Sequence, residues 1–439
     1  MMSLSEWQIL SFKEAGVQLI DCDHKTPPAS SYGYPYVTIP QIKNGRIDVS
    51  EARRITAEHF KEWTRKANPK PFDVVLSRRC NPGETAHVPA GLEFALGQNL
   101  VLLRANGEKV FPRYLRWLTR GVLWWEQISK FINVGAVFDS LRCADVPNFQ
   151  FPIPALHEQK AIASILTALD DKIELNRRMN ANLEAMARAV FKSWFVDFDP
   201  VRAKMAGRQP FGMSAATAAL FPSRLAPSEL GDIPEGWSVD QIGNAVTAVG
   251  GSTPSTENLE YWTDGQYAWV TPKDLSALKS PVLFTTERRI TDAGIRVISS
   301  GLLPSGTVLM SSRAPIGYIA IAETSVAINQ GFIAIVCDKE LPNLYVWQWL
   351  HANLDMIKSH ANGSTFQEIS KGSFRPLPCI IPSAKVLEKF QAIVLPIWQK
   401  LVANEKECLG LEKTRDYLLP KLISGDIRIR DAEKFMEAA

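Results

Sequence analysis

The 439-residue sequence predicts an α+β fold: two similar α/β domains, each followed by a long helix, with the two helices packed as an antiparallel coiled coil about a pseudo-two-fold axis. Three observations lead to this prediction. Residues 151–198 align with residues 379–426 at a constant shift of 228 positions and without a gap, and a shift of that size is the size of a domain. Apolar residues alternate at spacings of three and four in both copies, as in a coiled-coil helix. Short runs typical of strands precede each copy.

The first block, residues 1–154, mixes short apolar strands with loops. Runs that favour strands occur at residues 36–39, 73–76 and 99–103. Residues 112–131 are rich in Trp and Leu at helical spacing and predict one or two amphipathic helices. The block holds 19 Lys and Arg against 15 Asp and Glu, which gives it a net charge of +4.

A long helix is predicted over residues 155–200, beginning after Pro154 and ending at Pro200. At ~1.5 Å per residue it would be roughly 60 Å long, which is too long for the internal helix of a small domain. The residues expected to face a partner helix are Ile165, Leu169, Lys172, Asn176 and Leu183.

A linker enriched in Ala, Ser, Pro and Gly is predicted over residues 201–230, and a second block follows over residues 231–382. The second block repeats the strands of the first, but its loops differ in length, and loops are where recognition usually varies. It holds 10 Lys and Arg against 14 Asp and Glu, a net charge of −4. If this block binds DNA, its positive groups must be concentrated on one face, or a partner must supply part of the affinity.

The second long helix is predicted over residues 383–425, and residues 426–439 are expected to form a short strand or a frayed tail. Pro396 falls inside the helical pattern and should kink the helix or separate a first short piece. The residues expected to face the partner helix are Ile393, Ile397, Lys400, Asn404 and Leu411.

Polar residues stand at matched positions of the two helices: Lys172 and Asn176 in the first, Lys400 and Asn404 in the second. Polar residues between packed helices cost stability but can fix the register. The alternative is that they are simply solvated, with the apolar neighbours of the lysines, Ile173 and Leu401, in the buried places.

Two rigid helices packed side by side, with a block at each end, would hold two binding sites at a fixed separation. DNA is the obvious ligand for such an arrangement, because its half-sites recur in phase with the helical turn. Two pairs of loop motifs recur in both blocks. Residues 77–83 and 311–317 combine hydroxyls, Arg and turn residues, and Arg can bond guanine edges or clamp a phosphate. Residues 135–139 and 363–367 carry small residues whose backbone amides suit a phosphate.

An ordinary polar or capped turn is the alternative for each motif. Further candidates lie in loops and are solvated by default. The residues expected to contact DNA are Lys25, Thr26, Lys43, Ser77, Arg78, Arg79, Ser252, Thr253, Lys273, Ser311, Ser312, Arg313, Gly363 and Ser364.

The sequence offers no recognisable catalytic or metal-binding motif. It contains neither the Asn/Asp-Pro-Pro-Tyr/Phe run of amino-methyltransferases nor a GxxxxGK[ST] phosphate loop, and its six His and six Cys show no metal-ligand spacing. Asp170 and Asp171 form a carboxylate pair, but their place on the long helix favours a solvated face. No uncharged apolar run is long enough to span a membrane, no signal peptide is evident, and scattered cysteines favour a reducing cytoplasm.

Several motifs at the junctions between the blocks and the helices together resemble one family. They are Pro152-Ile153-Pro154 followed by Glu158-Gln159, residues 169–173, residues 191–201 and residues 231–237. The chain resembles the specificity subunits of Type I restriction-modification systems, and the resemblance covers nearly its whole length. It departs from the first motif in the second copy, where Val386-Leu387 replaces Glu158-Gln159, and Ala136 stands where the second copy has Ser364.

The resemblance implies a DNA-specificity subunit with no catalytic activity of its own. Residues 1–154 and 231–382 would be target-recognition domains, each reading one half of a bipartite, asymmetric site in double-stranded DNA. The helices would set the spacing and recruit two methyltransferase (modification) subunits and, through them, restriction subunits. The resemblance places S-adenosylmethionine in the methyltransferase subunit and ATP and Mg in the restriction subunit, in the cytoplasm of a bacterium or archaeon. Two alternatives are a DNA-modifying enzyme with an unrecognised active site and a protein-binding scaffold.

Overall fold

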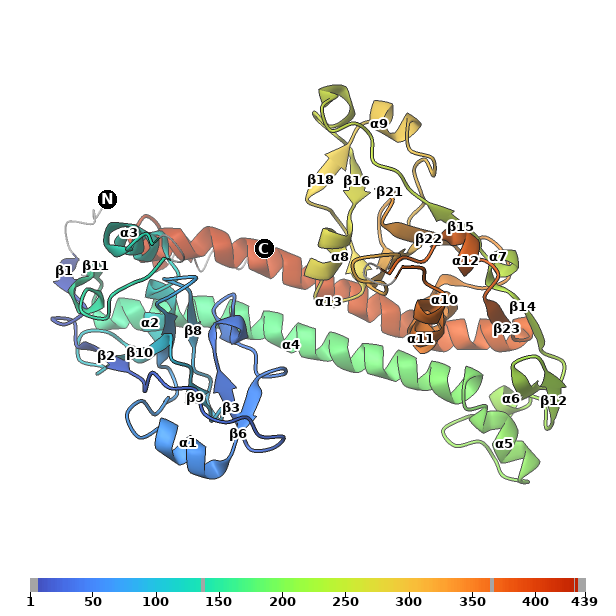
Figure 1. Ribbon diagram of the computed structural model, residues 1–439, viewed down its shortest axis with the longest axis horizontal. Coiled ribbons are helices and arrows are strands. Elements are labelled where there is room, and N and C mark those ends of the chain that lie inside the picture. Colours follow the sequence, from blue (N-terminus) through green and yellow to red (C-terminus); the bar gives the residue numbers. More distant parts are fainter. Residues whose placement is uncertain (1–6, 136–138, 364–366, 430, 433–439) are drawn as a thin grey trace. The chain divides into compact units, whose positions relative to one another are not determined.

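A computed structural model describes residues 7–135, 139–363, 367–429 and 431–432. The chain forms two compact units. The first comprises residues 1–173 and 409–439, and the second comprises residues 174–408 (Figure 1). Each unit therefore contains part of both long helices as well as a globular block. None of the helices in the described part of the chain is long and apolar enough to cross a membrane.

The first unit is built on an antiparallel four-stranded sheet in the order β2-β10-β7-β8, with a three-stranded sheet β6-β3-β9 beside it. Its strands are β1 (Gln8–Ser11), β2 (Val17–Asp21), β3 (Tyr34–Val37), β4 (Ile42–Lys43), β5 (Arg46–Ile47), β6 (Arg53–Ile55), β7 (Val74–Ser77), β8 (Thr85–His87), β9 (Ala95–Leu96), β10 (Leu100–Ala105) and β11 (Gln150–Ile153). Its short helices are α1 (Ala57–Trp63), α2 (Pro112–Leu118) and α3 (Val122–Phe131). Residues 112–131 thus form two helices. In the core of this unit, these two helices pack against the central sheet and against the long helices.

The second unit has the same plan, with a five-stranded sheet β15-β22-β19-β20-β17 and a three-stranded sheet β18-β16-β21. Its strands are β12 (Leu225–Ser228), β13 (Gly231–Pro234), β14 (Ser238–Gln241), β15 (Thr247–Gly250), β16 (Tyr267–Val270), β17 (Val282–Leu283), β18 (Arg288–Ile290), β19 (Val308–Ser311), β20 (Ile319–Ala322), β21 (Val326–Ile328), β22 (Phe332–Val336) and β23 (Pro378–Ile381). Its short helices are α5 (Asp199–Met205), α6 (Ala215–Ala218), α7 (Ile242–Ala245), α8 (Pro272–Ala277), α9 (Asp292–Arg296), α10 (Asn343–Ala352), α11 (Leu354–Ser359) and α12 (Lys371–Phe374).

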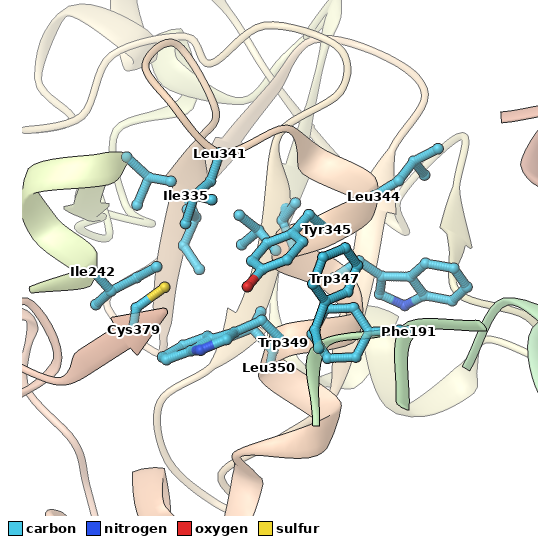
Figure 2. Packing of buried hydrophobic residues seen from close by; sticks show 14 of the residues in the cluster. Phe191, Ile242, Ile335, Leu341, Leu344, Tyr345, Trp347, Trp349, Leu350 and Cys379 are labelled. Carbon is cyan, nitrogen blue, oxygen red and sulfur yellow. The ribbon is translucent and has the colours of Figure 1, made fainter. Parts of the chain in front are cut away.

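Aromatic side chains join the globular block of the second unit to the long helices. Tyr345 on α10 lies 5.1 Å from Phe191, ring centre to ring centre, and both are almost fully buried (Figure 2). Phe195 and Phe390 pack in the same cluster, edge to face at 5.1 Å. Burying a large aromatic side chain contributes ~1.5–3 kcal/mol, so this cluster is a main source of the unit's stability.

The long helices are α4 (Leu156–Phe195) and α13 (Ala384–Ser424), and the predicted fold class is confirmed. The predicted end of the first helix at Pro200 and the predicted separation of a short piece at Pro396 are wrong. α4 ends at Phe195, and Pro200 stands in the first turn of α5, where its missing N–H costs nothing. α13 runs through Pro396 without a break. Proline inside a helix costs ~3 kcal/mol, and burial of Val394 and Trp398 on either side offsets this.

The two long helices run antiparallel within the second unit, where asparagines form cross-helix hydrogen bonds. Asn404 donates to Asn180 at 2.9 Å, and Asn176 donates to the carboxylate of Glu407 at 2.8 Å. Asn176, Asn180 and Asn404 are each 1% exposed. The lysines are different: Lys172 and Lys400 are exposed, and Ile173 and Leu401 occupy the buried places, as the alternative interpretation held.

Residues 201–230, whose composition predicts a linker, are folded into α5, α6 and β12. Phe221 is buried and packs edge to face on Trp194 at 5.0 Å and against Trp237 at 6.4 Å. Val201 is also buried in the same core. Two apolar anchors therefore attach this segment to the second unit despite its linker-like composition.

Candidate nucleic-acid interface

The same loop follows the third strand of the central sheet in each unit. It joins β7 to β8 in the first unit and β19 to β20 in the second. Cys80 and Ala314 both adopt left-handed backbone, with φ of 64° and 53°. Gly83 and Gly317, three residues on, have φ of 100° and 107°, a region that favours glycine. The two loops therefore share left-handed backbone at the same two positions, although their side chains differ.

The described residues just after the second pair of motifs lie against this loop in both units. In the first unit, the Leu141 amide donates to the Arg78 carbonyl at 2.8 Å. In the second, the Ile369 amide donates to the Ser312 carbonyl at 3.0 Å. Segments more than 50 residues apart in the sequence thus meet in each unit. Gly363 is exposed there, whereas Ser364 and Ala136 lie outside the described residues.

The hydroxyl groups predicted to contact DNA instead shape these loops. The Ser77 hydroxyl donates to the Arg79 carbonyl at 3.1 Å, and the Ser311 hydroxyl donates to the Pro315 carbonyl at 2.7 Å. Both serines are 0% exposed, and Ser312 is 2% exposed. A base could reach these hydroxyls only if the loops opened.

The arginines of the loops are more accessible than the serines. Arg79 is exposed, and Arg78 and Arg313 are half-buried. Arg313 lies 3.7 Å from the carboxylate of Glu368, a long contact between partly exposed groups that contributes little. These guanidinium groups remain candidates for contact with DNA.

Asp21, Cys22 and His24 come together beside Arg78, although their spacing in the sequence gave no metal signal. His24 uses both ring nitrogens, one with the Gln98 carbonyl at 2.9 Å and one with Asp21 at 3.1 Å. Burial raises the pKa of the Cys22 thiol to about 11, and a metal requires the thiolate. We therefore infer that these three residues support the loop at Arg78 through hydrogen bonds and do not form a metal site.

A cavity of about 440 Å³ opens next to this support in the first unit. Its polar lining includes Thr26, Glu51, Arg53, Gln98 and Asn99. These side chains offer both hydrogen-bond donors and acceptors, which is what contact with base edges requires. Thr26 was predicted as a contact, and the other four were not.

The remaining predicted residues are dispersed. Lys25 is exposed, and Lys43 is exposed with its amine 3.9 Å from Asp48. In the second unit, Thr253 donates a hydrogen bond to Gln330, and the Ser252 hydroxyl accepts from the Ser299 amide at 3.2 Å. Lys273 forms an ion pair with Glu287 at 2.7 Å, which raises the pKa of the lysine.

Sequence reasoning overlooked two arginines at equivalent places in the two units. Arg53 on β6 lies opposite Tyr36, and Arg288 on β18 lies opposite Trp269, in the same strand register. The signal was available, because the four-residue sequence Arg-Arg-Ile-Thr occurs at both places.

A family model described as Type I restriction modification DNA specificity domain matches residues 20–185 and 234–407. The chain belongs to the Type I restriction-modification DNA specificity family. It is 35% identical over 445 residues to the Type I restriction enzyme MjaIX specificity subunit of Methanocaldococcus jannaschii, a match that covers 97% of this chain and 94% of that protein. It is 26% identical over 410 residues to the Type I restriction enzyme HindI specificity subunit of Haemophilus influenzae, with 82% and 87% covered.

A solved structure has the same fold. The crystal structure of a Type I restriction-modification S subunit from M. genitalium matches 95% of this chain and 96% of that one, with a TM-score of 0.55 and 16% identity. At that identity the likeness concerns the fold alone. The comparison therefore supports the overall fold described above and assigns no role to any residue of the loops or the cavity.

In this specificity-family chain, an ionic network attaches the globular block of the first unit to its helices. Asp170 on α4 is 2% exposed, so the expectation of a solvated face is wrong for this residue. Its carboxylate lies 2.5 Å from Arg116, 3.0 Å from Arg46 and 3.0 Å from Arg415. Burial alone would raise the pKa of Asp170, but the three guanidinium groups outweigh it and lower the pKa to about 2.

Proposed function

We propose that this chain is the DNA-specificity subunit of a Type I restriction-modification enzyme. Residues 1–154 and 231–382 would act as target-recognition domains, each reading one half of a split, asymmetric site in double-stranded DNA. One observation carries the proposal: the same loop-and-segment surface is built twice on the same strands. The two copies share their left-handed backbone positions and a backbone hydrogen bond, but Arg78 in one copy corresponds to Ser312 in the other. Similar backbones with different side chains suit two domains that recognise different sequences.

The long helices would fix the number of unread base pairs between the half-sites and dock two methyltransferase subunits. Restriction subunits would join through these. Methyl transfer from S-adenosylmethionine would take place in the methyltransferase subunits, and the reactions that need ATP and Mg in the restriction subunits. This chain would recognise DNA and catalyse neither reaction. The complex would act in the cytoplasm, where DNA and the partner subunits are present.

A domain exchange tests the proposal. Residues 1–154 are replaced by the corresponding block of a relative that keeps arginine at the positions of Arg46 and Arg116, so that Asp170 stays paired. The hybrid is expressed with its methyltransferase subunits, and methylated sites are mapped across a host genome. One half of the recognised sequence should change and the other should persist. If both halves stay unchanged, the proposal is wrong.

Purified chain without partners separates this function from the two alternatives. A DNA-modifying enzyme would transfer methyl groups or cut DNA alone, whereas we expect neither reaction without the partner subunits. A protein-binding scaffold would not give the assembled complex a sequence-dependent, salt-sensitive affinity for DNA, which we expect in a gel-shift titration.

A further inference from the structure

The two units share one identical tetrapeptide at an equivalent place. Arg53-Arg54-Ile55-Thr56 and Arg288-Arg289-Ile290-Thr291 each form an edge strand and the start of the next helix. Both strands pair antiparallel with the middle strand of the three-stranded sheet, in the same register (Figure 1). The loops around them differ in length and sequence, so the four identities require a physical reason.

The fold accounts for the last two positions. Ile55 and Ile290 are 0% exposed and fill the small core under the sheet. Thr56 and Thr291 cap the next helix, with hydroxyls that accept from the His59 amide at 3.3 Å and the Gly294 amide at 3.2 Å. Replacing such a cap costs ~1 kcal/mol, so these identities serve stability.

The fold also accounts for the second arginine. Arg54 donates to the Gly33 carbonyl at 3.2 Å, and Arg289 donates to the Gln266 carbonyl at 2.7 Å. In both units, that carbonyl belongs to the residue just before the middle strand. This arginine therefore fastens the edge strand to the start of its neighbour.

Among the described residues, the side chain of the first arginine forms no such hydrogen bond. Arg53 and Arg288 are exposed, and among the described residues neither guanidinium forms an ion pair with a carboxylate. Arg53 lines the 440 Å³ cavity with Thr26, Gln98 and Asn99. Of the four shared residues, only this one is exposed in both units.

In the second unit, aromatic rings hold the first arginine in place. The Arg288 guanidinium lies 3.9 Å from the ring centre of Trp262 and 5.2 Å from that of Trp269. Stacking on an aromatic face orients the planar group and leaves its in-plane N–H donors able to reach a ligand. A guanidinium oriented in this way loses less entropy on binding.

The three-stranded sheet that carries the first arginine is connected to the loop described above. In the first unit, the Asn99 carbonyl accepts from the Arg78 amide at 3.1 Å, and Asn99 lines the cavity of Arg53. In the second unit, the Gly331 carbonyl accepts from the Ser312 amide at 2.8 Å. The segment that follows β9 or β21 thus connects the loop to the three-stranded sheet in each unit.

We propose that Arg53 and Arg288 are equivalent base-reading residues, one for each half of the DNA site, and that Arg54 and Arg289 only position them. The guanidinium would donate two parallel hydrogen bonds to one base, and guanine, with its O6 and N7 acceptors, is the base that fits. This inference rests on the proposed function.

The test uses the full chain assembled with its methyltransferase subunits. Variants R53K and R288K keep the charge but lose the two-pronged donor, and R53A and R288A lose both. R113A is the matched control, because it removes an arginine from an exposed site of the first unit that lies over Phe72. Methylated sites are mapped for each variant, and binding to duplexes with single base-pair changes is titrated at several salt concentrations.

R53K should relax discrimination at one base pair of one half-site by roughly 5- to 150-fold, the range of one bidentate contact. R288K should do the same in the other half-site, and R113A should leave the recognised sequence unchanged. The inference is overturned if the R53K and R288K variants discriminate between base pairs at every position as the wild type does. It is also overturned if R53A and R288A weaken all duplexes equally and reduce the salt slope by about one, which marks a phosphate contact. Failure of the wild type to recognise a split site would instead overturn the proposed function.

Discussion

Asp170 is the residue whose replacement should loosen the first unit most selectively. Its carboxylate contacts guanidinium groups from three separate segments: Arg46 on β5, Arg116 on α2 and Arg415 on α13. D170N keeps the shape of the side chain but removes its charge. Arg116, which is 9% exposed, would then remain buried without a counter-charge.

The magnitude follows from the pKa of Asp170, which the three arginines lower to about 2 although burial opposes them. Against an unfolded value of ~3.9, the difference of ~2 pKa units corresponds to about 2.5 kcal/mol of folding free energy at neutral pH. Breaking a buried ion pair by removing one partner costs ~3–5 kcal/mol, because the other charge is stranded. We expect D170N to lose about 3 kcal/mol or more in the first unit.

The pH dependence has a definite sign. The folded pKa lies below the unfolded one, so the stabilisation is complete above the unfolded value and is lost as the pH falls through the folded value. Wild type and D170N should therefore differ fully at pH 7 and converge between about pH 5 and pH 2.

Hydrogen exchange measured on peptides from α2 is the suitable assay, because it reports opening of the first unit alone. D171N is the control, since Asp171 is the exposed neighbour on the same helix and should change protection little. The reasoning fails if α2 is protected equally in D170N and wild type at pH 7. It also fails if the loss of protection is the same at pH 7 and pH 3.5.

Three further predictions concern the helices and the shared loop. Burial raises the pKa of Glu184 to about 7, although Arg188 opposes this, and Glu405 adds to the rise. The stability that the protonated Glu184 contributes is therefore lost as the pH rises from about 4.5 to 7. E184Q should raise the free energy of unfolding at pH 8 by ~1 kcal/mol in a denaturant titration, and an unchanged value would contradict this. G317A should cost ~1–3 kcal/mol in thermal unfolding, because a Cβ at this φ of 107° would lie 2.6 Å from Leu354; stability within 0.5 kcal/mol of wild type would refute it. N404L should lower the free energy of unfolding by ~1–3 kcal/mol, because it leaves the buried Asn180 without its hydrogen-bond donor. The double variant with N180L should recover most of this loss, and additive losses in the double-mutant cycle would count against the cross-helix pair.

The period of the long helices could be predicted from the sequence, but their buried faces could only partly be assigned. Lys172 and Ile173 are adjacent, and spacing of three and four admits either in a seam. The choice depends on which residues of the partner helix face them, and that information is non-local. The same spacing placed Asn176 and Asn404 in the seam, and both are buried, whereas the lysines at equally matched positions are exposed.

Asp170 shows why the candidate site could not be fully predicted. Its three partners lie 124, 54 and 245 residues away in the sequence, so no local pattern distinguishes it from the exposed Asp171. The linker-like segment is a similar case, because burial of Val201 and Phe221 outweighs a composition rich in Ala, Ser and Pro. The first arginines of the shared tetrapeptide differ from both cases, since comparison of the two copies with each other would have revealed them.

The two units attach their globular blocks to the long helices by opposite chemistry at equivalent positions. The buried tyrosines Tyr114 and Tyr345 align α2 with α10, which places Arg116 opposite Asp170 in one unit and Trp347 opposite Trp398 in the other. The two tryptophans pack at 5.2 Å, ring centre to ring centre. Well-packed apolar side chains can replace a buried ion pair without loss, so both solutions are stable by themselves.

A mixture of the two solutions would not be stable. Grafting the second globular block onto the first helix would set Trp347 against Asp170 and bury a carboxylate that has lost the guanidinium closest to it. The cost, ~3–5 kcal/mol, is a large share of the stability of one unit. We therefore expect that globular blocks can be exchanged between equivalent positions of two relatives, but that exchange between the two positions of this chain requires residue 170 or 398 to change with the block.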